Sequence, residues 1–298
     1  MHAQLGENSY GKSAIRLVKV VREGTRHSLH DLTVDVRLEG DFERAHVAGD
    51  NAAVLPTDTM KNTVYALART HDVHPPEAFA ALVGMRLLEA SPWATCVTVD
   101  VARHGWNRIM TDGHAHDTAF QHASEEQRTA SVRSVRAAPG HVEAGVRDLV
   151  VLRTSGSAFS GFPRDAYTTI AETRDRIFAT SLTAGWRYAA TPADYNTAFA
   201  AVRQALLGTF ASHASESVQH TLFAMGQAAL EASADVEEIH LSLPNRHHLL
   251  VDLTPFQLDN PNAIFVATTE PYGLIEATLR RPAPSGFSQT TAHGSPPP

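Results

Sequence analysis

Cysteine is almost missing from this sequence, and so are the long apolar runs that mark membrane and secreted proteins. Cys96 is the one cysteine among 298 residues, so no disulfide can form within the chain and no cluster of thiolates can bind a metal. A chain without disulfides suits a reducing compartment, and we expect a cytoplasmic location. Nowhere do eighteen apolar residues follow one another, and residues 1–10 lack a basic segment followed by an apolar run. We therefore expect a protein that is neither exported nor embedded in a membrane.

An excess of positive charge is also absent. The 25 lysines and arginines are outnumbered by 32 acidic residues, which gives a net charge of -7, and the basic residues are scattered along the chain. Such a chain has no basic stripe to neutralise a phosphate backbone, so nucleic acid is excluded as an expected partner. Hydrophobic residues make up 43% of the sequence, enough for a buried core. Because single cores stop growing near roughly 250 to 300 residues, two domains are expected.

The first half of the chain has the apolar pattern of two strands, two helices and two further strands. Alternating apolar residues predict a β-hairpin from about 15–20 and 32–38, and strands at 97–101 and near Ala119. Between them the apolar period becomes helical from Thr57, with Thr57 or Asp58 as the expected N-cap, and a second helix follows Pro75 and Pro76. The order is β-β-α-α-β-β.

The second half repeats this order without sequence identity between the halves. Strands are expected at 130–135 and 149–152, helices around 199–210 and 218–229, and closing strands at 239–243 and 249–253. We place the first unit at residues 1–126, with 1–9 flexible, the second at 127–280, and a flexible Pro-rich tail at 281–298. Exposed edges of two antiparallel sheets favour closure by a neighbouring copy.

Several short segments carry a resemblance to one known family. The most specific lies between Leu149 and Arg176, where Phe159, Phe162, Tyr167 and Arg176 occur at characteristic spacings. Residues 10–12, 57–65, 162–165, 242–248 and 271–276 add further matches. On these residues the chain resembles the urate oxidase (uricase) family over nearly its whole length. It departs from the family pattern at three positions, where the family more often has Lys, Leu and Lys: Arg153, Ile170 and Arg246.

The resemblance implies an α+β architecture, the tunnelling fold (T-fold), in which two tandem ββααββ units form antiparallel sheets that close into barrels on oligomerisation. It also implies a homotetramer with active sites at subunit interfaces. The implied partners are urate and dioxygen, and the implied reaction converts urate, dioxygen and water into 5-hydroxyisourate and hydrogen peroxide. No cofactor and no metal are expected, because the electron-rich urate anion can itself pass an electron to dioxygen, a step that usually needs a cofactor.

The resemblance also assigns roles to individual residues. The catalytic residues would be Lys12, Thr57 and His247, with Lys12 taking a proton from urate through the Thr57 hydroxyl. Urate would be bound by seven residues, namely Thr57, Asp58, Phe159, Arg176, Val218, Gln219 and Asn245. Arg176 would contribute a bidentate fork and Phe159 a stacking surface. Thr57 and Asn245 would also hold dioxygen, and then water, above the purine ring.

Each assignment has a plain structural alternative. Taken alone, Lys12 is a solvated side chain, Thr57 a helix cap, Arg176 a surface ion-pair partner and Phe159 a core residue. His114, His116 and Asp112 suggest a metal site, but no His-Glu-x-x-His or Cys-x-x-Cys pattern supports one. Two other functions stay open at this point: a zinc-dependent pterin or purine hydrolase of the same fold, and a purine-binding oligomer without activity.

Overall fold

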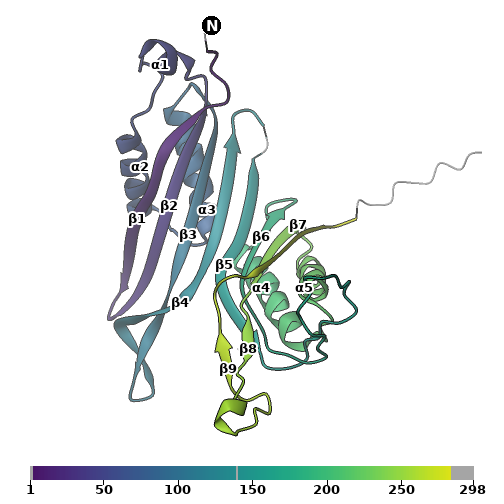
Figure 1. The fold of residues 1–298 in the computed structure, drawn as a ribbon. Coiled ribbons are helices and arrows are strands. Elements are labelled where there is room, and N and C mark those ends of the chain that lie inside the picture. The colour runs from purple at the N-terminus through teal and green to yellow at the C-terminus, as the bar shows by residue number, and fades with distance from the viewer. Residues whose placement is uncertain (1–2, 139, 283–298) are drawn as a thin grey trace, which may run out of the picture.

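The computed structural model describes residues 3–138 and 140–282, and its main feature is one eight-stranded antiparallel sheet (Figure 1). The strand order across the sheet is β1-β2-β3-β4-β5-β6-β7-β10, which follows the chain except at the last position. The bounds of these strands are β1 Ser9–Glu23, β2 Arg26–Gly40, β3 Ala94–Thr111, β4 His114–Val135, β5 His141–Arg153, β6 Phe178–Tyr188, β7 Val236–Asn245 and β10 Gly273–Arg280. The β4–β5 pairing joins the two halves of the chain into a single sheet.

One face of this sheet is apolar because alternate residues of neighbouring strands are in register. A row of cross-strand partners runs from β2 to β7, and all of its members are buried: Val34, Val101, Ala130, Ala144, Trp186 and Ile239. A one-residue slip in any pairing would turn that strand's apolar side chains to the opposite face. The register is therefore specified by burial.

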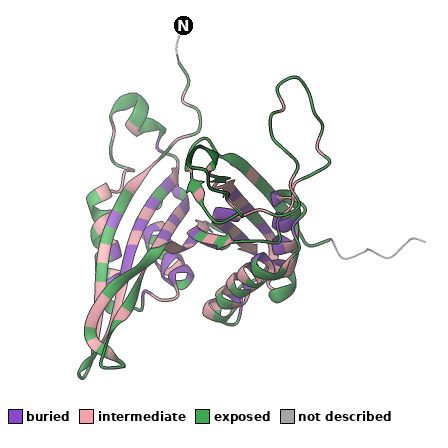
Figure 2. Ribbon diagram, turned by 60° about the horizontal axis from the view of Figure 1, so that its bottom comes forward, coloured by how far each residue is buried: buried purple, intermediate pink, exposed green. Residues whose placement is uncertain are grey.

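Helices cover this apolar face in two pairs. α2 (Thr57–Thr70) and α3 (Pro76–Ala90) pack on the first half of the sheet, and α4 (Tyr195–Ser212) and α5 (Val218–Ala232) pack on the second. Each pair closes its own hydrophobic core, and the buried positions lie between the helices and the sheet (Figure 2). A short helix, α1 (Glu43–Ala48), has no buried residue. The predicted order ββααββ thus occurs twice.

The predicted helices around 199–210 and 218–229 are present as α4 and α5. Val202, Leu206 and Phe210 of α4 are buried, and so are Val218, Leu222, Met225 and Ala229 of α5. The predicted N-cap of α2 is wrong, since Pro56 occupies that position and Thr57 is the first helical residue. Proline has no side-chain acceptor, so the N-cap residue makes no side-chain hydrogen bond to the first-turn N–H groups of α2.

The strand predictions for the second half need three corrections. Residues 130–135 belong to β4 of the first half and do not begin the second. β6 was not predicted, because small or polar residues, Thr180 and Ala184, occupy positions on its buried face and so weaken the apolar alternation. Residues 249–253 do not close the sheet: β8 (His248–Leu250) pairs with β9 (Phe265–Ala267), a 3-10 turn η1 (Thr254–Phe256) lies between them, and β10 takes the place beside β7.

The proposed division at residues 126 and 127 falls inside β4, and it stays a prediction. Of the segments predicted to be flexible, residues 1–2 and 283–298 lie outside the described residues. Residues 3–8 are described and belong to no helix or strand, whereas Ser9 is the first residue of β1.

Candidate active site

Lys12 lies on β1 beside a bulge that interrupts the pairing with β2. The register shifts between Lys12 and Ile15, and Ala14 adopts a left-handed conformation with φ 55. The backbone N–H of Ala14 donates to Asp35 Oδ1 at 2.7 Å, which fixes the bulge to β2. Bulges of this kind bend a strand locally and re-aim its side chains. Lys12, half-buried at this point, is therefore held by β2 as well as by its own strand.

Thr57 and Asp58 begin α2, which packs against β1. The Asp58 carboxylate is exposed and accepts hydrogen bonds from Lys61 Nζ and, at 2.9 Å, from Asn62 Nδ2. Its pKa is lowered, chiefly by the Lys61 hydrogen bond and charge and further by the charge of Lys12. Lys12 lies on β1, the strand against which α2 packs. The structure thus brings Lys12, Thr57 and Asp58 into one group, hereafter the amino-terminal group.

Phe159 and Arg176 contact each other within the long connection between β5 and β6. The guanidinium carbon of Arg176 lies 5.3 Å from the centroid of the Phe159 ring. Phe162 stacks on Phe159 with centroids 4.8 Å apart and planes 15° apart. The backbones of Phe159 and Thr173 exchange two hydrogen bonds, of 2.8 and 3.0 Å, which hold the two sides of the connection together. The Arg176 guanidinium therefore lies over the Phe159 ring, and Phe162 stacks on the same ring.

Arg176 has donor capacity that the described chain does not use. Its Nε is buried and has no hydrogen-bond partner among the described residues. Burial lowers the pKa of the guanidinium, although an arginine stays charged at any physiological pH. A partly desolvated fork of this kind pairs most strongly with a planar acceptor edge that carries negative charge.

The start of α5 lies beside this connection. Ser217 is the N-cap and its hydroxyl accepts from the N–H of His220 at 3.1 Å, while Val218 and Gln219 occupy the first turn. Ala158 N–H donates to Ser215 O at 2.7 Å and so ties the Phe159 segment to this helix start. The first N–H groups of a helix have no partner within it and favour an anion.

Asn245 and His247 lie at the end of β7. Asn245 pairs with Thr180 of β6 on one side and Gly273 of β10 on the other, and its Nδ2 lies 3.4 Å from His247 Nδ1. His248 Nδ1 instead lies 3.0 Å from Arg246 O, so the two neighbouring histidines have different partners. Thr180 is fully buried and its hydroxyl has no partner among the described residues, a feature that no sequence signal indicated.

We call the candidate site residues of the second half the carboxy-terminal group: Phe159, Arg176, Val218, Gln219, Asn245 and His247. No hydrogen bond, ion pair or aromatic contact among the described residues joins them to the amino-terminal group. Six strand spacings separate β1 from β7 in the sheet, so at about 4.8 Å each they lie roughly 29 Å apart along it. One copy of the chain does not bring the two groups together.

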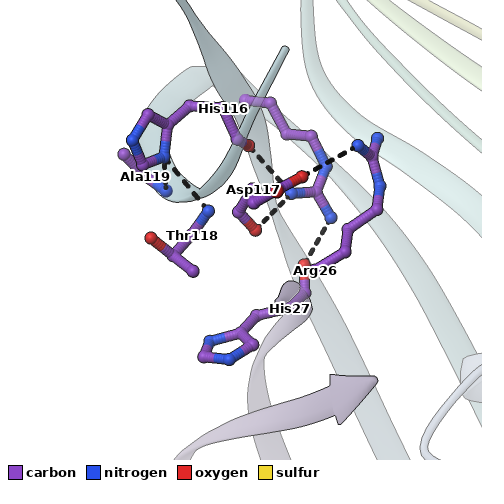
Figure 3. Close-up of polar contacts among 7 residues, drawn as sticks. Arg26, His27, His116, Asp117, Thr118 and Ala119 are labelled. Carbon is purple, nitrogen blue, oxygen red and sulfur yellow. Dashed lines mark hydrogen bonds and ion pairs between the residues drawn. The ribbon is translucent and has the colours of Figure 1, made fainter. Parts of the chain in front are cut away.

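The histidine-rich turn between β3 and β4 has a structural role (Figure 3). His116 Nδ1 accepts the backbone N–H groups of Thr118 and Ala119, both at 3.1 Å. Arg108 donates to the carbonyls of His116 and Asp117, at 3.0 and 2.7 Å, and also to that of His27 in β2. Among the described residues no group of three or more metal-ligating side chains converges. The turn is thus held to the neighbouring hairpin by arginine.

Comparison with known proteins identifies the family. A family model described as Uricase matches residues 8–133 and 142–276. The chain belongs to the uricase family. It is 47% identical over 277 residues to the uricase of Arthrobacter globiformis, with 93% of this chain and 90% of that protein covered. It is 36% identical over 282 residues to the uricase of Dictyostelium discoideum, with 94% and 98% covered.

Crystal structures of uricases have the same fold. The uricase of Arthrobacter globiformis matches with a TM-score of 0.90 at 45% identity, over 97% of this chain and 99% of that one. A hyperthermostable mutant of the Bacillus sp. TB-90 urate oxidase matches with a TM-score of 0.78 at 20% identity, over 92% and 99%, which supports the fold alone. The predicted family and the α+β tunnelling fold of this chain are confirmed. Among the described helices, none is long and apolar enough to cross a membrane.

Proposed function

We propose that the chain oxidises urate with dioxygen and water to 5-hydroxyisourate and hydrogen peroxide, at sites that two copies of the chain share. Membership of the uricase family supports this oxidation over the zinc-dependent hydrolase and the inactive purine-binding oligomer. The observation that carries the assignment of the site is the pairing of Arg176 with Phe159. A cationic fork with an unused buried donor, set beside an aromatic face, suits a flat anionic heterocycle.

Each residue of the carboxy-terminal group then has a binding role. Arg176 donates two hydrogen bonds to the pyrimidine side of urate, and the Gln219 amide with the Val218 N–H completes the contacts to that ring. Phe159 stacks on the purine face, a contact of roughly 0.5 to 1.5 kcal/mol beyond the burial of area. Asn245, at the end of β7 between β6 and β10, holds dioxygen and then water above the ring.

The amino-terminal group of a second copy supplies the proton transfer. Thr57 and Asp58 meet the five-membered ring through backbone N–H groups at the start of α2, where a helix favours an anion. The Thr57 hydroxyl passes a urate proton to the Lys12 amine, and His247 of the other copy moves protons to the peroxide and from water. Overall, urate gives two electrons to dioxygen, two protons go to the peroxide, and water supplies the oxygen of the new C5 hydroxyl.

The sharing follows from the separation of the two groups within one chain. β1 and β10 are the edge strands of the sheet, and unpaired edges invite a neighbouring copy. Pairing between copies brings the β1 edge of one toward the β7–β10 edge of the other and closes a barrel. A homotetramer of two such pairs and a cytoplasmic location remain parts of this proposal.

The reaction can be tested by following urate loss and dioxygen uptake after exhaustive chelation. We expect one dioxygen consumed for each urate, at a rate that chelation does not change. Lys12→Met serves as the inactive reference prepared in the same way. Activity lost on chelation and restored by zinc would favour the hydrolase. Urate bound without dioxygen uptake would favour the inactive oligomer.

A further inference from the structure

The connection between β5 and β6, residues 154–177, carries both Phe159 and Arg176 yet contains no helix or strand. Two isolated β-bridges are its only regular pairings, Ser157 with Ser215 and Phe159 with Thr173. A segment with so little regular structure does not hold two binding groups in place by backbone pairing alone. The side chains that fix it are therefore part of how the site is built.

Gly156 is the point at which these side chains meet. Its N–H donates to Asp175 Oδ1 at 2.6 Å, and its carbonyl accepts from Ser215 N–H at 3.1 Å and from Arg153 Nη2. Its φ of 76 lies in the left-handed region, where glycine is favoured. The N–H and the carbonyl of Gly156 thus both have partners, and two of these, Asp175 and Ser215, lie far from it in the sequence.

Arg153 connects Gly156 to the end of a helix. As the last residue of β5, it donates through Nη1 to Phe210 O at 3.2 Å and to His213 O. These are carbonyls at the carboxyl end of α4, where a cation satisfies unpaired acceptors and interacts with the helix dipole. One guanidinium therefore fixes the start of the connection to α4.

Asp175 connects Gly156 to the end of the same segment. It directly precedes Arg176, and its backbone exchanges hydrogen bonds with the Thr173 hydroxyl, of 2.9 and 3.3 Å. Thr173 in turn pairs with Phe159. Asp175 therefore links Gly156 to both binding residues. It directly precedes Arg176 in the chain, and it reaches Phe159 through two successive hydrogen-bonded contacts, Asp175 with Thr173 and Thr173 with Phe159.

We propose that Arg153 and Asp175 are positioning residues for urate, which act through Gly156 to keep Phe159 and Arg176 in contact. The inference rests on the proposed function, because it assumes that Phe159 and Arg176 bind the purine. Neither Arg153 nor Asp175 touches the substrate. Losing either one frees the connection, so binding weakens more than the chemical step.

The test compares disruptive with conservative substitutions. Asp175→Ala removes the acceptor of Gly156 N–H, whereas Asp175→Asn keeps Oδ1; Arg153→Met removes the donors, whereas Arg153→Lys keeps a cation near the carbonyls. We expect the first of each pair to raise KM for urate about 10-fold or more, as for one lost charge-assisted hydrogen bond, with kcat changed less than about 3-fold. The conservative member of each pair should recover most of the loss.

Asp165→Ala is the matched control. Asp165 lies in the same connection and also accepts a backbone N–H, that of Tyr167 at 2.9 Å, but its side-chain hydrogen bonds stay within residues 165–168. Its KM should stay within about 2-fold of that of the unmodified chain, since no bond to Gly156 is lost. A KM as high as in Asp175→Ala would mean that any change in the connection weakens binding, and would overturn the proposal.

Two further measurements separate this inference from the proposed function. Urate turnover by the unmodified chain tests the function. Two measurements test the positioning without turnover. One is the affinity for xanthine, which has the same pyrimidine-dione edge as urate, and the other is hydrogen exchange at the Gly156 and Phe159 amides. Faster exchange and weaker xanthine binding in Asp175→Ala, both reversed in Asp175→Asn, support it. Unchanged KM and exchange in Asp175→Ala, or Asp175→Asn as impaired as the alanine variant, would refute it.

Discussion

Two impaired variants of this chain should restore activity when they assemble together. Lys12→Met damages the amino-terminal group and Arg176→Ala damages the carboxy-terminal group, and these groups lie roughly 29 Å apart along one sheet. If each active site takes one group from each of two copies, a mixed pair has one site built from both intact groups. Its second site combines both damaged groups and is inactive.

The expected activity follows from counting pairs. Random assembly of equal amounts gives about half mixed pairs, and each has one intact site of two, so about one quarter of the unmodified activity should return. A chain with both substitutions, co-expressed with the unmodified chain, gives a second constraint. Its mixed pairs have no intact site, and only the quarter of pairs made of two unmodified chains is active, so the activity should again be about one quarter. Sites within one chain would instead give about one half, because every unmodified chain would be active.

The assay is urate loss at a concentration below KM, so that the rate follows kcat/KM. Differently tagged chains allow the mixed assemblies to be purified and their composition to be verified. Separately expressed variants, mixed after purification, control for activity that arises without exchange of chains. No recovery in verified mixed assemblies, together with about one half of the activity in the second combination, would refute shared sites.

Three other outcomes are expected. Arg176→Ala should raise KM for urate about 10- to 100-fold with a smaller change in kcat, and Arg176→Lys should recover only part, because a lysine has no planar fork; full recovery in steady-state kinetics would refute the bidentate role. Lys12→Met and Thr57→Ala should each lower kcat by roughly 10² to 10⁴, and the double variant should be little worse than the poorer single one, so multiplicative losses would contradict a single relay. Burial and the nearby charge of Arg103 lower the pKa of His74 to about 4 in the folded chain. As the pH falls, His74 of the unfolded chain therefore takes up its proton at a higher pH than His74 of the folded chain. The free energy of unfolding should therefore fall as the pH drops from 6.5 toward 4, by about 1–2 kcal/mol after allowance for partial exposure, and urea unfolding of His74→Phe should lack this component.

The helices of this fold could be predicted more fully than the strands. In each helix, apolar residues recur every three or four positions over several turns, and the buried residues of α4 and α5 have this spacing. β6 shows why strands were harder: Thr180 and Ala184 lie on the same buried face as Leu182, so small and polar residues stand where a strand pattern would have large apolar ones. Burial alternates along this strand, but the apolar character of its residues does not.

The last strand shows a different limit. Residues 249–253 have the alternation of a strand, but β8 is only His248–Leu250 and pairs with β9 outside the main sheet. β10, at Gly273–Arg280, is beside β7. Which of two strand-like segments completes a sheet depends on pairing between residues far apart in sequence, and local pattern does not contain that choice.

The residues of the candidate site came from the resemblance, because each one alone has an ordinary structural explanation. The structure adds how some of them are held. Nothing in the sequence indicates that Asp35 secures the bulge after Lys12, or that Gly156 is bonded by both Arg153 and Asp175. The contacts of Asp35 with Ala14 and of Asp175 with Gly156 join residues 21 and 19 positions apart, and no spacing rule predicts them.

Both groups of the proposed site are fixed within their own copy before any association. The bulge at Lys12 is bonded to β2, and the Phe159 connection is bonded to α4 and to the start of α5. Ordering a loop or a side chain during association costs free energy, and groups that are ordered beforehand avoid most of that cost. Pairing of sheet edges then has to supply only the alignment of two rigid halves. Substitutions at Arg153 or Asp175 should therefore weaken urate binding while leaving association of the chains intact, whereas substitutions that disrupt the β1 edge should reduce both.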